Sequence, residues 1–167
     1  MPTSARLNFV RQQGFREADA SDCAARYPAL MFQPRLVGVV VLIALLLQSG
    51  PMFLVLSVLL WWNVLLPARN PFDHLYNRLI AAPQGLQKLE PAPPPRRFAQ
   101  GMAGGFMFAV GLCLLAGWLL AAWILQVLLV TALSALIFGR FCLGSYVYFL
   151  LRGNSRFANR TLPWAHG

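Results

Sequence analysis

Two long apolar blocks without any charged residue dominate the sequence. No charge lies between Arg35 and Arg69, and none lies between Arg97 and Arg140. A helix on the surface of a soluble domain has a polar face, whereas helices formed from these blocks are apolar on almost every side. The pattern therefore predicts an all-α integral membrane protein, and the position at which each block is interrupted predicts how many helices it contains.

Residues 48–51, Gln-Ser-Gly-Pro, interrupt the first block, which runs from residue 36 to residue 66. A single helix of that length would be about 46 Å long at about 1.5 Å per residue, whereas the hydrocarbon core of a bilayer is about 30 Å thick. We therefore expect two helices, at about 36–49 and 51–66, with Pro51 in the first turn of the second. Both are shorter than the roughly 20 residues of a full span, so the pair either crosses a thinned bilayer or forms a re-entrant hairpin.

The second block predicts two helices that are each close to a full span, at about 98–116 and 118–139, with Gly117 between them. Two crossings return the chain to its starting side, so the basic residues that flank both blocks share one side. Basic residues near membrane spans remain in the cytoplasm. The expected architecture is therefore four transmembrane helices in two hairpins, multi-pass in the inner (plasma) membrane, with both termini and the central loop (residues 67–97) in the cytoplasm.

The polar ends of the chain complete the expected organisation. Residues 1–32 are expected to form a flexible N-terminal tail, residues 33–152 a single membrane domain, and residues 153–167 a C-terminal tail. A cleaved secretory signal needs an apolar core of about 7–15 residues, and residues 1–30 contain none. Translation can begin at Met1 or at Met31, and the pattern is compatible with both.

The central loop contains the pattern of a short amphipathic helix. Asn70 and Pro71 are typical of the cap and first turn of a helix. Apolar residues then recur with helical spacing, at Phe72, Leu75, Tyr76, Leu79 and Ile80. We expect this helix to lie at the membrane surface with four polar residues facing water, namely Asp73, His74, Asn77 and Arg78. A lone exposed histidine is usually a solvated residue, so His74 does not by itself predict catalysis.

Small residues recur every four positions along the third expected helix. This small-residue stripe consists of Gly101, Gly105, Ala109, Cys113 and Gly117. A face of this kind allows another helix backbone to approach closely. We expect the stripe to pack against another helix, either within the monomer or in a second copy or another membrane protein, with Cys113 as a small apolar spacer.

The composition supports a membrane protein and reduces the number of chemical functions that the sequence predicts. The 167 residues are 58% hydrophobic and 11% charged, against roughly 45–50% and about 25% in soluble domains. The net charge of +9 comes mostly from arginines outside the apolar blocks, and no basic helix face with interleaved aromatics predicts nucleic-acid binding. The three cysteines lack disulfide or zinc-ligand spacing, and no catalytic motif predicts an enzyme. We expect no cofactor, and we expect the lipid bilayer to be the main partner.

The last informative stretch, residues 138–148, is Phe-Gly-Arg-Phe-Cys-Leu-Gly-Ser-Tyr-Val-Tyr. It resembles the Phe-Cys-x-Gly-Cys-x-x-Tyr signature of a bacterial membrane family known as domain of unknown function 4395. Asn70-Pro71 and the Pro-Arg-Arg-Phe-Ala-Gln of residues 95–100 fit the same family. The resemblance implies a multi-pass membrane protein without an assigned activity. The candidate motif comprises Arg140, Cys142, Gly144 and Ser145. Because Ser145 stands where the family has its second cysteine, the motif cannot support a two-thiol cycle.

Three functional hypotheses remain open at this point. The first is a non-enzymatic scaffold or accessory subunit that packs through the small-residue stripe and presents the loop helix to a cytoplasmic partner. The second is a thiol-dependent redox or sulfur-handling accessory that uses Cys142. The third is a small-solute carrier lined by neutral polar residues, although these are also expected to be interhelical hydrogen-bond partners: Gln48, Asn63, Gln100, Gln126 and Thr131.

Overall fold

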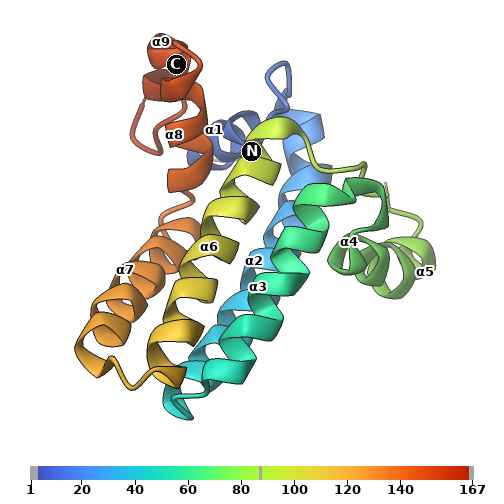
Figure 1. Cartoon of the computed structure of the whole chain (residues 1–167). Coiled ribbons are helices and arrows are strands. Elements are labelled where there is room, and N and C mark those ends of the chain that lie inside the picture. Colours follow the sequence, from blue (N-terminus) through green and yellow to red (C-terminus); the bar gives the residue numbers. More distant parts are fainter. Residues whose placement is uncertain (1–3, 87, 166–167) are drawn as a thin grey trace.

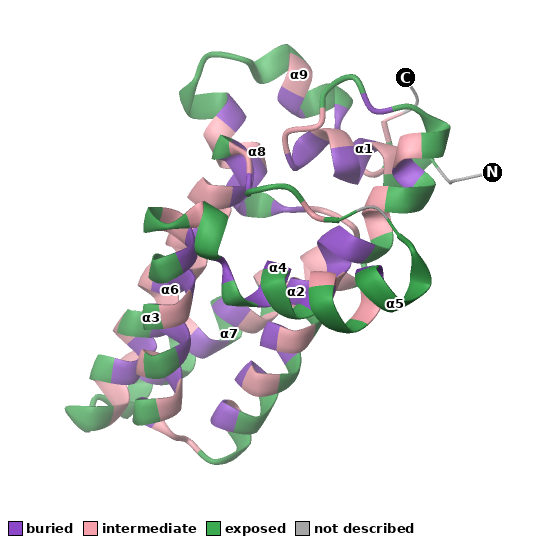
Figure 2. Ribbon diagram, turned by 90° about the vertical axis from the view of Figure 1, so that its right-hand side faces the viewer, coloured by how far each residue is buried: buried purple, intermediate pink, exposed green. Residues whose placement is uncertain are grey.

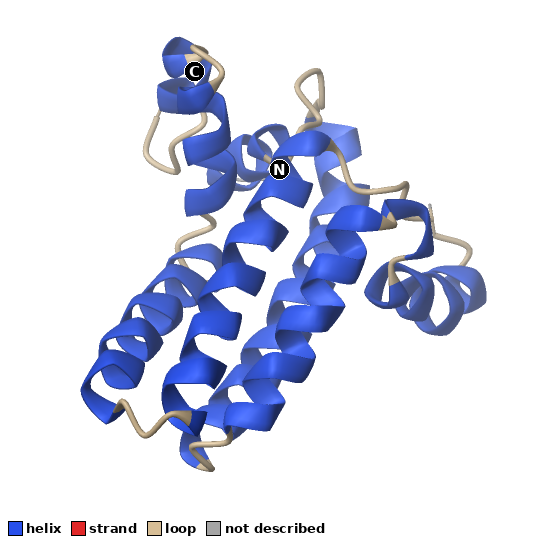
Figure 3. Ribbon diagram, viewed as in Figure 1, coloured by secondary structure: helices blue, strands red, loops and turns tan. Residues whose placement is uncertain are grey.

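The computed structural model describes residues 4–86 and 88–165, and every regular element in these ranges is a helix (Figure 3). The all-helical part of the expected fold is therefore confirmed. Residues 1–3 and 166–167, which include Met1 and the ends of both expected tails, lie outside the described residues.

Three helices of the described chain are long and apolar enough to cross a membrane. They are α2 (Ala20–Leu46), α6 (Pro94–Leu115) and α7 (Leu119–Ile137). Helix α3 (Gly50–Leu65) is equally apolar but has only 16 residues. Many positions along these helices are exposed (Figure 2). Large apolar residues occupy many of them, and Leu46 and Leu120 are about four-fifths exposed. An exposed apolar surface of this extent requires an apolar surrounding medium, so the chain has the character of a membrane protein.

Both interruptions of the apolar blocks are turns in the structure. Helix α2 ends at Leu46, Gln48 adopts a positive φ of 46°, and the hydroxyl of Ser49 accepts a hydrogen bond from the backbone N–H of Met52 at the start of α3. Gly117, with a φ of 75°, separates α6 from α7. The two turns lie at the same end of the molecule, and α1, α8 and α9 lie at the other end (Figure 1).

The expectation of a flexible N-terminal tail was wrong for the described residues. Residues Ser4–Gln12 form helix α1, and α2 begins at Ala20 rather than near residue 36. Asp19 caps α2, because its carboxylate accepts hydrogen bonds from the backbone N–H groups of Ser21 and Asp22 and from the Ser21 hydroxyl. These bonds, above all that from the Asp22 N–H, hold the pKa of the Asp19 carboxyl below its usual value.

The N-terminal helices pack because they bury a small apolar cluster. Phe9, Val10 and Cys23 are almost completely buried, together with Cys142 from the other end of the chain. These apolar residues are too widely spaced in the sequence to resemble a membrane block. The expected tail is therefore a folded layer over one end of the helix bundle (Figure 1).

Helices α3 and α6 form the most extensive helix contact in the described part of the chain. A Cβ atom at Gly111 would lie 2.8 Å from the Leu54 side chain and 3.0 Å from the backbone oxygen of Gly50, and one at Gly104 would lie 3.1 Å from Trp61. The hydroxyl of Ser57 donates to the backbone oxygen of Gly104 at 2.9 Å. The core beside this contact consists of Phe53, Leu56, Leu60, Met107 and Val110.

The small-residue stripe is not the face along which these helices meet. A Cβ atom at Gly105 would meet no atom within 4 Å, and one at Gly101 would make only an ordinary contact of 3.6 Å with Val64. Gly117 is exposed in the turn. The face that packs on α3 contains Gly104 and Gly111. Met107 and Val110, which lie between them in the sequence, are buried in the core. Within the monomer, the stripe therefore lies beside the main interface.

The remaining elements are short. The loop between α3 and α6 contains a 3₁₀ turn η1 (Pro67–Arg69), helix α4 (Pro71–Tyr76), a π-helical turn η2 (Asn77–Ala81) and α5 (Ala82–Gln84). After α7 come α8 (Leu143–Leu151) and α9 (Ser155–Arg160). Ala158 of α9 is buried, so the region expected to be a C-terminal tail also contains a packed helix. Helix α8 lies against the start of α6, where a Cβ atom at Gly144 would be 2.6 Å from the Cα atom of Ala99.

Candidate functional site: a buried polar network beside an apolar cavity

A buried ion pair links the central loop to the start of α6. The Nη2 atom of Arg96 lies 2.7 Å from Oδ1 of Asp73, and its Nη1 atom lies 3.4 Å from Oδ2. Arg96 is 5% exposed and Asp73 is 6% exposed. Charges that are this deeply buried are tolerated only when they are paired and hydrogen-bonded, so the loop and α6 are held in one arrangement.

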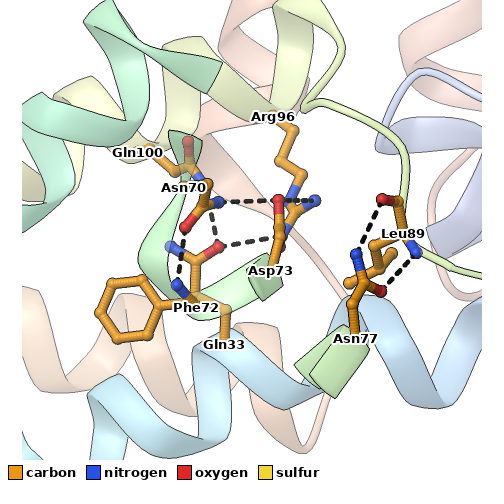
Figure 4. Close-up of polar contacts among 8 residues, drawn as sticks. All are labelled: Gln33, Asn70, Phe72, Asp73, Asn77, Leu89, Arg96 and Gln100. Atoms are coloured by element: carbon orange, nitrogen blue, oxygen red, sulfur yellow. Dashed lines mark hydrogen bonds and ion pairs between the residues drawn. The ribbon is translucent and has the colours of Figure 1, made fainter. Parts of the chain in front are cut away.

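Three amides complete the polar network around this ion pair (Figure 4). Gln33 Oε1 accepts from Arg96 Nη2 at 2.9 Å and from Gln100 Nε2 at 2.8 Å. The Nδ2 atom of Asn70 donates to Asp73 Oδ2 at 2.8 Å. All five residues of the network, Gln33, Asn70, Asp73, Arg96 and Gln100, are at least nine-tenths buried. The network therefore joins α2, α4 and α6 through charge-assisted hydrogen bonds.

Local structure places these side chains. Asn70 caps α4, since its Oδ1 atom accepts from the backbone N–H of Phe72 at 3.0 Å. This leaves its Nδ2 atom free to bind Asp73 in the first turn. Arg96 lies in the first turn of α6, which begins at Pro94 rather than near residue 98. The extra turn carries the guanidinium back toward the loop.

The expectation that Asp73, His74, Asn77 and Arg78 face water together was only partly correct. His74 and Arg78 are exposed, but Asp73 is buried against Arg96. The side chain of Asn77 both donates to the backbone oxygen of Leu89 (3.3 Å) and accepts from its N–H (2.8 Å). The loop helix is therefore fixed by polar contacts on its inner side, while two residues of its expected apolar face are exposed, Leu75 and Leu79.

An apolar cavity of about 230 Å³ lies next to the network, between α2, α6 and α7. Side chains such as Val37, Phe106 and Leu133 form its walls. Gln33, Arg96 and Gln100 lie at its polar end. This volume exceeds that of an apolar cavity of roughly 150 Å³ that binds benzene. The site thus combines room for an apolar group with hydrogen-bonding groups at one end.

One polar atom of the network has no partner. The Oε1 atom of Gln100 is buried and accepts no hydrogen bond in the structure, although the Nε2 atom of the same amide is paired with Gln33. Leaving a buried acceptor unpaired costs about 1–3 kcal/mol. Gln100 is therefore the one network residue whose bonding is incomplete beside the cavity.

The candidate motif lies at the same end of the cavity. Cys142 is 5% exposed, lines the cavity, and donates its backbone N–H to Gln12 Oε1 at 2.8 Å. The hydroxyl of Ser145 donates to the backbone oxygen of Pro95 at 3.3 Å. Arg140 adopts a positive φ of 54° in the turn before α8. The motif thus closes the end of the cavity through packing and backbone contacts, and no group of three or more potential metal ligands occurs among the described residues.

A family model described as a domain of unknown function, DUF4395, matches residues 28–153. The chain belongs to the DUF4395 family. This confirms the resemblance drawn from the residues around Cys142. The DUF4395 region extends from α2 through α8 and includes the whole polar network. No curated protein and no solved structure matches the chain.

Sequence reasoning found some parts of this DUF4395 site and missed others. It identified Asn70 as a helix cap, Gln100 as an interhelical hydrogen-bond partner, and Cys142 as part of a motif. It missed Gln33 and the pairing of Asp73 with Arg96. The available signal was that a lone aspartate follows a helix cap in a loop that ends in two arginines, Arg96 and Arg97.

Proposed function

We propose that this DUF4395 protein is a non-enzymatic accessory protein of the inner (plasma) membrane that binds an amphipathic molecule in the cavity between α2, α6 and α7. The cavity is the observation that carries this proposal, because its walls are apolar and its end beside α8 is polar. Ligand sites commonly combine apolar walls with a few polar groups that fix orientation.

An energetic argument supports binding in the cavity. The walls offer an apolar molecule contact with side chains of three helices, among them Val37, Phe106 and Leu133. Burial of apolar surface is favourable by about 25 cal/mol per Å², so an apolar chain gains free energy from these walls.

Four crossings in two hairpins form part of the same proposal. Helices α2 and α3 are the first hairpin, and α6 and α7 are the second. At about 1.5 Å per residue, the 16 residues of α3 extend about 24 Å, so a full crossing uses a locally thinned bilayer or flanking residues. Basic residues are absent from the turns at residues 47–49 and 116–118. They are frequent in α1, α9 and the loop, and Arg140 and Arg152 stand on either side of α8. This distribution supports cytoplasmic termini and a cytoplasmic loop.

The proposal is tested by measuring bound molecules. The purified full chain in mild detergent should retain an apolar molecule of low mass, detected by native mass spectrometry and by organic extraction. Ala132 lines the cavity, so Ala132→Trp should fill the space and remove the retained molecule. Val127 on the same helix is 60% exposed on the outer face, so Val127→Trp is the matched control and should retain it.

The same retention experiment also gives the result that would overturn the proposal. If the native protein carries no molecule above the level seen with Ala132→Trp, the cavity is not a binding site. Equal retention by Ala132→Trp and Val127→Trp would place any bound lipid on the outer surface instead.

A further inference from the structure

We infer that the cavity takes up one hydrocarbon chain of a bilayer phospholipid, which enters sideways between α6 and α7 while the headgroup stays at the membrane surface. The inference rests on the proposed function and names the class of its ligand. The place where the cavity opens and the medium outside that opening determine this class.

The polar end of the cavity is covered by the protein. Gln33, Arg96 and Gln100 line this end, and each is at least nine-tenths buried. Gln13 and Cys142 also line the cavity, and each is 5% exposed. These polar groups therefore face other parts of the protein rather than water, and the cavity reaches the surface elsewhere.

The cavity opens at the side, between α6 and α7. Two residues of its lining are largely exposed, Leu128 of α7 (51%) and Leu143 at the start of α8 (43%). Met102 and Phe106 line the cavity from α6 and are partly exposed. A residue that lines a cavity and is also exposed marks the place where the cavity meets the surface. All four of these side chains are apolar, so the opening suits an apolar group.

This opening lies at the depth of the hydrocarbon core. Leu128 is the middle residue of α7 (Leu119–Ile137), a helix that is about as long as the core is thick at about 1.5 Å per residue. Ile124 and Val127 beside it are more than half exposed, so the opening continues into the apolar outer surface of α7. The molecules outside an opening at this depth are lipid chains, which are therefore the ligand available at the highest concentration.

The space fits part of one chain. Small side chains line the cavity at Ala99, Ala103 and Ala132 and leave room between the helices. The volume of about 230 Å³ exceeds that of an apolar cavity of roughly 150 Å³ that binds benzene, but a phospholipid with two chains and a headgroup is far larger. One chain therefore enters, toward the buried residues Met107 and Leu129, and the rest of the lipid stays in the bilayer.

The position of the opening also assigns the leaflet. Leu143 places part of the opening beside α8, and α8 lies at the end of the molecule opposite the two helix turns (Figure 1). The nearest headgroups are those of the leaflet on the α8 side, so the lipid belongs to that leaflet.

The test maps where photoreactive lipids label the protein. The full chain is reconstituted in phosphatidylcholine nanodiscs that contain one of three probes: phosphatidylcholine with a diazirine within one chain, phosphatidylcholine with a diazirine on the headgroup, or the free fatty acid with the same diazirine chain. After irradiation, mass spectrometry locates the labelled residues. The chain probe should label Met107 and Leu129, and the headgroup probe should not.

Two variants test the route of entry. Leu128→Trp enlarges a side chain at the opening, so labelling of Met107 and Leu129 by the chain probe should be lost. Ile124 lies one turn away on the same helix and is 54% exposed, but it does not line the cavity. Ile124→Trp is therefore the matched control and should label like the native protein. Equal labelling of the two buried residues in both variants would overturn entry between α6 and α7.

The native protein separates failure of the inference from failure of the proposed function, even if a variant does not fold. If the free fatty acid labels Met107 and Leu129 but the phospholipid chain does not, the inferred ligand class is wrong while the cavity remains a binding site. If none of the three probes labels these two buried residues, the proposed function is overturned, and the inference with it.

Discussion

Arg96 and Asp73 illustrate how single residues fix this fold. A buried ion pair is weak evidence of net stabilisation, because the desolvation of both charges offsets their attraction. Its value lies in specificity: only the arrangement that brings the loop against α2 and α6 pairs Arg96 with Asp73 and Gln33. Removing one partner therefore costs far more than removing both.

Replacing Asp73 with Asn should destabilise the protein strongly. The substitution leaves the Arg96 charge buried without a counter-ion, which costs about 3–5 kcal/mol. The expected result is a clearly lower thermal unfolding temperature in detergent, measured by circular dichroism. The double variant Asp73→Leu with Arg96→Met should recover most of the loss.

The exposed pair Arg26–Glu90, at 3.7 Å with Glu90 60% exposed, provides the control. Exposed pairs contribute about 0–1 kcal/mol, so Glu90→Gln should change the unfolding temperature little. If Asp73→Asn were as mild as Glu90→Gln, the network would not hold the loop in place.

Cys142 should react slowly in the folded protein. Cys142 belongs to the apolar cluster formed with α1, lines the cavity, and is only 5% exposed. With Cys23 and Cys113 replaced by Ala, a charged maleimide should label Cys142 only after unfolding in strong detergent. Rapid labelling of the native protein in membrane vesicles would mean that α1 leaves this site, and would favour the thiol-dependent hypothesis.

At the scale of elements, the sequence predicts where apolar helices are broken but not which face of each helix packs. The interruptions at residues 48–51 and at Gly117 are visible because turn residues stand within apolar sequence, and both are turns in the structure. The contact face of α6 is decided by Leu54 and Trp61 of α3, which no periodicity within α6 can reveal. The packing of α1 depends on Phe9 and Val10 reaching Cys142, a contact that spans almost the whole chain.

Two glycines one turn and a half apart on α6 should therefore respond differently to enlargement. Gly111→Leu places a side chain against Leu54 and the Gly50 backbone, where a Cβ atom already approaches to 2.8 Å and 3.0 Å. Overpacking of this kind costs about 1–3 kcal/mol, and the unfolding temperature should fall.

Gly105→Leu is the matched control, since a Cβ atom there meets nothing within 4 Å. Leucine is a better helix former than glycine by about 1 kcal/mol, so this variant should be at least as stable as the native protein. A smaller particle in size-exclusion chromatography with Gly105→Leu would instead show that the small-residue stripe packs against a second copy.

For the whole molecule, the all-helical class with membrane-spanning helices was predictable, and the cavity was not. Apolar blocks flanked by arginines predict helices in a membrane. The regular elements of the described residues are all helices, three of them of spanning length, which agrees with that prediction. The cavity arises because α7 is the least buried of these helices and stands beside α2 and α6 without filling the space between them. Such a gap depends on the placement of three helices at once.

The two-hairpin topology gives a prediction at this scale. Reporters fused after Gly50 and Gly117 should be detected on the exterior side of the membrane, and reporters fused after Gly85 and at the C-terminus should be detected in the cytoplasm. The charge-free turns and the basic loop and ends are the reason. An outside signal at Gly85 would contradict two full hairpins, and a cytoplasmic signal at Gly50 alone would mean that α2 and α3 re-enter from one side.

The pairing of α3 with α6, rather than with its sequence neighbour α2, has a consequence for biosynthesis. When the ribosome has completed α3 and the loop, α6 has not yet been made. The chain then lacks both the glycine-containing face of α6 that packs on α3 and the counter-ion of Asp73. Until α6 is synthesised, α3 lacks the helix against which it packs, and the Asp73 carboxylate lacks its counter-ion. Chains that end early remain in that state, which exposes them to proteolysis, so this fold itself discriminates complete chains from truncated ones.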